Sequence, residues 1–109
     1  NDEKKSIEIS DGKAKNCVSL NWENGTIELK AEKNLKLAVG NNEINMTSSG
    51  EITLKSSKKI GLDTVELASK TSAKTQIESS GQAMLKSSGT LNVEASGVTV
   101  IKGGLVKIN

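Results

Sequence analysis

The chain has 109 residues, a net charge of +2, one Trp and no Phe, Tyr, His, Arg or Pro. So few large side chains disfavour an ordinary two-layer globular core. Without Arg or stacking aromatic residues, nucleic-acid binding is not expected either. The single cysteine, Cys17, excludes an intrachain disulfide framework.

The sequence contains no apolar run long enough to span a bilayer as a helix. The charged start, residues 1–5, lacks the apolar region of a signal peptide. We expect it to be a domain boundary within a longer protein.

Residues 6–30 predict a small antiparallel meander. Ile7 and Ile9 alternate with polar residues, a turn signal follows at Asp11-Gly12, and Val18, Leu20 and Trp22 alternate again. Asn24-Gly25 is a strong hairpin signal. We assign residues 1–25 to this N-terminal meander, with Trp22 closing one end of the core.

From residue 26 onward, a repeat of about eight residues takes over. Its clearest copy is Gly50-Glu-Ile-Thr-Leu-Lys-Ser-Ser57, in which Ile52 and Leu54 share one face of an extended chain. Similar pairs recur along the chain, and 20 of the 22 paired positions are apolar although only 34% of the chain is. Residues 26–109 are therefore predicted to form one repetitive β-structure.

The corners between these strands decide how the chain continues. Most are rich in Ser, Lys or Asn and lack the residues that hairpin turns require, so hairpins at every step are not expected. A chain that turns the same way at each corner becomes a β-helix. One chain could form it as a solenoid, but the near-constant spacing favours three identical chains wound together.

The prediction is thus an all-β fold: an intertwined homotrimeric triple-stranded β-helix with octad repeats, preceded by the short meander. The predicted trimer core comprises Ile27, Leu29, Leu35, Leu37, Ile44, Met46, Ile52, Leu54, Ile60, Leu62, Leu67, Ile77, Leu85, Leu91, Val93, Val98 and Val100. Ser69 and Thr75 break the apolar pattern. They indicate either a local bulge or a polar layer able to hold water or an ion on the axis.

The octads, the segment 6–12 and the ending Gly103-Gly-Leu-Val-Lys-Ile-Asn109 resemble the C-terminal spike of VgrG proteins and the related central spikes of contractile phage tails. The resemblance implies a trimeric membrane-puncturing needle of a type VI secretion system or similar injection machine. It would be assembled in the bacterial cytoplasm, then ejected outside the cell or into a target cell.

The same resemblance implies partners at both ends. An Hcp-type tube would bind through N-terminal domains absent from this sequence, and a PAAR-type tip protein would dock at Leu105, Val106 and Ile108. Some phage spikes hold a metal at their apex through His, and this sequence has none. No metal, cofactor or nucleic acid is expected.

Two other functions compete with this one. An enzyme would have to use carboxylates such as Glu28, Glu66, Glu78 and Glu94, which fall on outward strand positions without His or Tyr to assist them; no enzymatic activity is expected. A trimeric stalk of an adhesin or phage tail fibre has the same repeat, and differs in continuing into a receptor-binding head.

Overall fold

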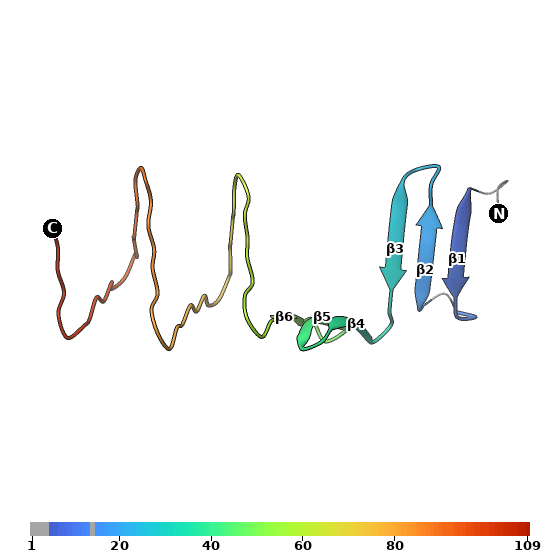
Figure 1. Cartoon of the computed structure of the whole chain (residues 1–109), viewed down its shortest axis with the longest axis horizontal. Coiled ribbons are helices and arrows are strands. Elements are labelled where there is room, and N and C mark those ends of the chain that lie inside the picture. The colour runs from blue at the N-terminus through green and yellow to red at the C-terminus, as the bar shows by residue number, and fades with distance from the viewer. Residues whose placement is uncertain (1–4, 14) are drawn as a thin grey trace. The chain divides into compact units, whose positions relative to one another are not determined.

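The computed structural model describes residues 5–13 and 15–109. In these residues the fold is all-β, with six strands in two antiparallel three-stranded sheets and no helix (Figure 1). The chain divides into two units, residues 1–66 and 67–109. Both sheets belong to the first unit.

The first sheet is the meander β1–β2–β3, formed by Ser6–Ser10, Cys17–Asn21 and Thr26–Lys30. Its antiparallel pairing confirms the N-terminal meander predicted from the sequence. The third strand begins at Thr26, where the shaft was predicted to begin, so the first octad pairs with the meander.

The loop between β2 and β3 explains why this hairpin forms. It spans four residues, 22–25, and ends at Gly25, whose positive φ of 71° suits a residue without a side chain. The side-chain oxygen of Asn21 accepts hydrogen bonds from the backbone amides of Glu23 and Asn24, at 3.1 and 3.2 Å. This Asx turn anchors the loop on the residue that precedes it, the last residue of β2.

The second sheet is β4–β5–β6, formed by Asn34–Val39, Asn42–Thr47 and Ile52–Lys55. Gly40 and Asn41 join β4 to β5, and the positive φ of 58° at Gly40 fits a type II′ turn. Residues 48–51 join β5 to β6, and Gly50 takes a φ of 102°. There the Gly50 amide donates to the carbonyl of Thr47 at 3.1 Å.

This second sheet corrects the expectation that the chain turns the same way at each corner. Between residues 34 and 55, successive octads pair with each other as antiparallel hairpins. The physical reason lies in two glycines: Gly40 and Gly50 accept the positive φ that reverses the chain, which the polar composition of the corners had concealed.

After β6 the chain remains extended. Residues 56–109 contain bends but no strand paired within the chain (Figure 1). Their backbone amides and carbonyls thus lack the ladder partners that the two sheets provide.

Candidate assembly interface

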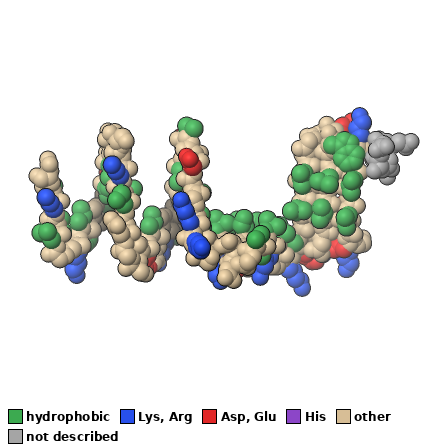
Figure 2. Space-filling model, in the orientation of Figure 1, with side chains coloured by type: hydrophobic (Ala, Val, Ile, Leu, Met, Phe, Trp, Pro, Cys, Tyr) green, Lys and Arg blue, Asp and Glu red, His purple; other side chains and the backbone are tan. Residues whose placement is uncertain are grey.

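One face of the first sheet is entirely apolar along its cross-strand rows. The rows are Ile7–Leu20–Ile27 and Ile9–Val18–Leu29. The opposite face carries polar rows such as Glu8–Ser19–Glu28. In Figure 2 the hydrophobic side chains of this sheet gather on the side facing the viewer.

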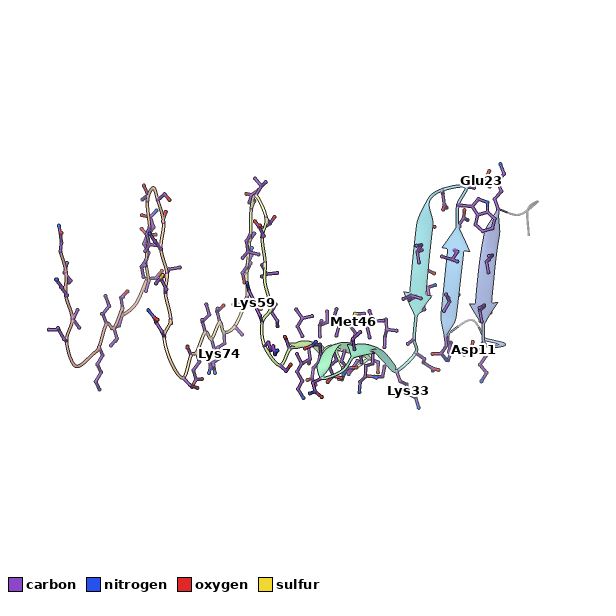
Figure 3. The ribbon with its side chains drawn as sticks, viewed as in Figure 1. Asp11, Glu23, Lys33, Met46, Lys59 and Lys74 are labelled. Carbon is purple, nitrogen blue, oxygen red and sulfur yellow. The ribbon has the colours of Figure 1, made fainter. Side chains whose placement is uncertain are left out.

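The second sheet has the same two-faced construction. Its apolar rows are Leu37–Ile44–Leu54 and Leu35–Met46–Ile52, and these are six of the predicted core residues. Its other face carries Lys36–Asn45–Thr53 and Ala38–Glu43–Lys55. Met46 marks the apolar side in Figure 3, and Figure 2 shows the hydrophobic side chains gathered on that side.

A hollow of about 460 Å³ lies at one end of this apolar face, beside the turn that follows β6. Leu37, Ile44 and Leu54 line it from the sheet, and Ile60 lines it from beyond the turn. The structure therefore places Ile60, a predicted core residue, at the same hollow as three residues of the apolar rows. No described residue fills the hollow.

The structure does not bring the later predicted core residues together. Those from Leu62 onward are exposed on extended chain: Leu62, Leu67, Ile77, Leu85, Leu91, Val93, Val98 and Val100. The predicted tip-docking residues Leu105, Val106 and Ile108 are exposed as well. The exposed fractions of the earlier and the later predicted core residues overlap, because Ile52 in β6 is 72% exposed and Leu91 is 52% exposed.

No side chain in the described residues is buried, so the single chain has no core. It exposes 11007 Å², whereas a folded monomer of its 11.5 kDa exposes roughly 5,800 Å². The excess is about 5,000 Å² per chain, whereas obligate interfaces bury roughly 2,000–5,000 Å² counted over both partners. The apolar faces of the two sheets thus remain uncovered by the described residues of the single chain.

Hydroxyl side chains begin six successive corners, a feature that the search for paired apolar residues missed. They are Ser48, Ser56, Thr64, Thr71, Ser79 and Ser87, each two residues after the second member of a pair. Ser56, Ser79 and Ser87 each donate to the backbone carbonyl three residues ahead, at 3.0, 3.0 and 3.1 Å. The sequence signal was available, because these hydroxyls repeat with nearly the same period as the pairs.

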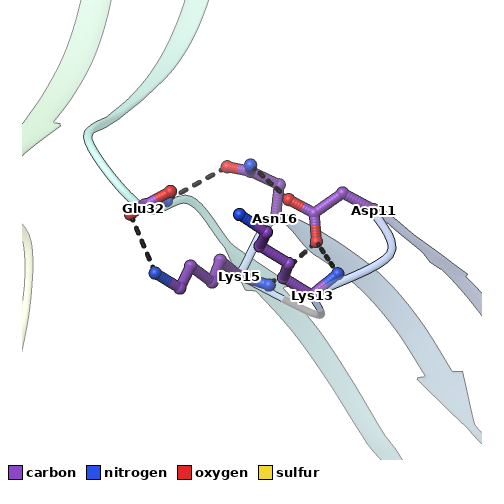
Figure 4. A network of polar contacts seen from close by, with 5 residues as sticks. All are labelled: Asp11, Lys13, Lys15, Asn16 and Glu32. Carbon is purple, nitrogen blue, oxygen red and sulfur yellow. Dashed lines mark hydrogen bonds and ion pairs between the residues drawn. The ribbon is translucent and has the colours of Figure 1, made fainter.

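A polar network ties the β1–β2 loop to the segment after β3 (Figure 4). The Asp11 carboxylate accepts hydrogen bonds from the side chain of Asn16 at 2.8 Å and from the amides of Lys13 and Lys15 at 3.2 and 3.0 Å. Asn16 in turn accepts from the Glu32 amide, and Lys15 pairs with the Glu32 carboxylate at 3.2 Å. The Asn16 bond, aided by those amides, lowers the pKa of Asp11.

Cys17 lies half-buried on the polar side of the first sheet. Loss of hydration, with the negative charges of Glu8 and Glu28, raises the pKa of its thiol. The thiol therefore stays protonated at neutral pH and is a weak nucleophile.

Within residues 5–13 and 15–109, no three His, Cys, Asp or Glu side chains gather as a metal site would require. The same residues contain no helix long and apolar enough to cross a membrane.

No protein-family model matches the chain, and no curated protein matches its sequence.

Proposed function

We propose that three copies of this chain form the spike shaft of a type VI secretion or related contractile injection machine. The observation that carries the proposal is the pair of uncovered apolar sheet faces, on a chain that exposes nearly twice the surface of a folded monomer. Three identical faces turned towards one axis would give each row its missing neighbours.

Two kinds of three-chain packing follow from the two parts of the repeat. In residues 34–55 each chain contributes a finished antiparallel sheet, so three sheets form the sides of a prism. Residues 56–109 have no intrachain ladder, so their backbone groups pair with the neighbouring chains, as in an intertwined β-helix. Interwinding thus begins after Lys55, later than the repeat itself.

Such a shaft is a mechanical rather than a catalytic part. Every backbone group that pairs across chains removes an exposed strand edge, so the rod resists unravelling under axial load. Leu105, Val106 and Ile108 end the last octad, and in this proposal they support a PAAR-type tip protein. The tip protein and the Hcp-type tube are the partners implied at the two ends.

The experiment is a matched pair of substitutions followed by light scattering of the purified chain. Ile52→Asp places a charge on the apolar face opposite Met46 and should prevent trimer formation, because three carboxylates would be buried together. Glu51→Ala, one residue earlier in the turn, should leave the trimer intact.

Three results would contradict the proposal. A wild-type mass of one chain would leave only a solenoid, and equal tolerance of both substitutions would mean that the inward face is wrong. A receptor-binding head following residue 109 in the full-length protein would favour the adhesin or fibre stalk.

A further inference from the structure

The charge of this chain changes sign along its length. Side chains of residues 1–54 include 7 Lys and 9 acidic residues, a net of −2. Those of residues 55–109 include 8 Lys and 4 acidic residues, a net of +4, which restores the +2 of the whole chain. The change falls at Lys55, the last residue of β6, where the intrachain sheet also ends.

The lysines of residues 55–109 are not neutralised by ion pairs. In the part of the chain that the structure describes, the ion pairs are Lys15–Glu32, Lys30–Glu28 and Lys36–Glu43, all before residue 55. Pairing across chains could not change the balance, because four acidic side chains cannot cancel eight lysines. A trimer would therefore carry a net of about +12 on this segment, since each chain contributes +4.

Strand geometry places most of these lysines on the outer side. Six of the eight adjoin a paired position directly, so they point to the opposite face of an extended chain: Lys55, Lys59, Lys70, Lys74, Lys86 and Lys107. Figure 3 labels Lys59 and Lys74 among the side chains of this segment. Along the extended chain these six lysines lie on the side opposite the apolar pairs, and we call them the lysine surface.

We propose that residues 55–109 bind anionic phospholipid headgroups through this lysine surface. Lysine is a compact, hydrated point charge that suits a diffuse anionic surface. Nucleic acid fits less well, because the segment has neither Arg for phosphate and base edges nor an aromatic residue for stacking. The inference rests on the proposed function, because three chains multiply the charge and a spike must meet a membrane.

The test uses the purified full chain and sedimentation with vesicles. Vesicles of phosphatidylcholine alone are compared with vesicles in which about a third of the lipid is phosphatidylglycerol. We expect at least tenfold stronger partitioning onto the anionic vesicles, because each lysine at the surface contributes about fivefold. Binding should weaken as salt is raised, since salt screens the attraction.

Two triple variants with equal charge change locate the site. The distal triple is Lys55→Gln, Lys58→Gln and Lys59→Gln; the proximal control is Lys30→Gln, Lys33→Gln and Lys36→Gln. The turn at residues 56–59 should survive the distal changes, because Ser56 holds it through backbone groups of Lys58 and Lys59. We expect the distal triple to reduce partitioning about tenfold or more and the control to change it less than twofold.

Several results would overturn the inference. These are an equal loss of vesicle partitioning in both triple variants, no preference of the wild-type chain for anionic vesicles, or stronger binding to a duplex DNA of matched charge. Light scattering of the same samples separates this from the proposed function. A trimer that ignores anionic vesicles refutes the lipid site alone, whereas a single chain in solution refutes the spike.

Discussion

Asp11 illustrates how one polar side chain can organise a loop without burial. Both of its carboxylate oxygens accept hydrogen bonds, from two backbone amides and the side chain of Asn16. Protonation would remove acceptors from this arrangement. For that reason the pKa of Asp11 is lowered in the folded chain, chiefly through the Asn16 bond.

The loop should therefore lose stability in acid. Because the folded pKa is below the unfolded value of about 3.9, the stabilisation is complete above about pH 4 and is lost as pH falls through the folded pKa. Asp11→Asn should lower the melting temperature at pH 7 and have less effect at pH 3. Thermal melts monitored by circular dichroism at both pH values measure this.

Glu23→Gln is the control, because the Glu23 side chain makes no hydrogen bond or ion pair within the described residues. An equal effect of Asp11→Asn at both pH values would mean that the carboxylate charge is not what holds the loop.

Among the elements, the corners show that the eight-residue period predicts the strands but not the direction of the turns between them. A repeat of eight fits a hairpin meander and a β-helical coil equally well, because both need about five strand residues and three turn residues. The apolar alternation correctly placed Leu35, Met46 and Ile52 on one face. It could not give the direction of the next turn, which depends on single φ values.

The sequence Ser-Ser-Gly occurs at residues 48–50, 79–81 and 87–89, and the first and last of these copies take different conformations. Gly50 has a φ of 102°, whereas Gly89 is outside the positive-φ region and has open space around its Cα. Gly50→Ala should therefore cost about 1–2 kcal/mol per chain. Gly89→Ala should be neutral or slightly stabilising, by up to about 1 kcal/mol.

Denaturant unfolding of the two variants at one chain concentration measures the difference. Equal losses of unfolding free energy in Gly50→Ala and Gly89→Ala would indicate that both corners adopt the same reversed conformation in the assembled protein. That outcome would extend the hairpin pattern beyond β6 and contradict interwinding there.

On the scale of the whole chain, the sequence predicted the class of the fold and the first sheet. The meander, the Asn24-Gly25 loop and the apolar faces all follow from local alternation. The second pair of hairpins did not, because Gly40 and Gly50 act through backbone freedom rather than through hydrophobicity. The candidate interface was predictable as a set of residues, because alternation alone places them on one face, whereas nothing in that alternation identifies what covers the face.

Stability should depend on chain concentration, because a single chain has no core of its own. For a trimer, each tenfold increase in concentration should add about 0.9 kcal/mol per chain to the free energy of unfolding. Equilibrium unfolding over a hundredfold range of concentration, with long incubation, tests this. A midpoint independent of concentration would indicate a chain that folds alone.

Backbone pairing within the chain ends at Lys55, and this bears on the order in which the segments would assemble. Hairpins such as those of β4–β6 close within about 1–10 μs, because their strands are neighbours in sequence. In the proposed trimer, residues 56–109 would pair only with other copies of the chain, in a slower step that depends on chain concentration. The two sheets, which form first, would therefore align the three copies. Residues 56–109 would then pair between chains progressively, from residue 56 towards the C-terminus.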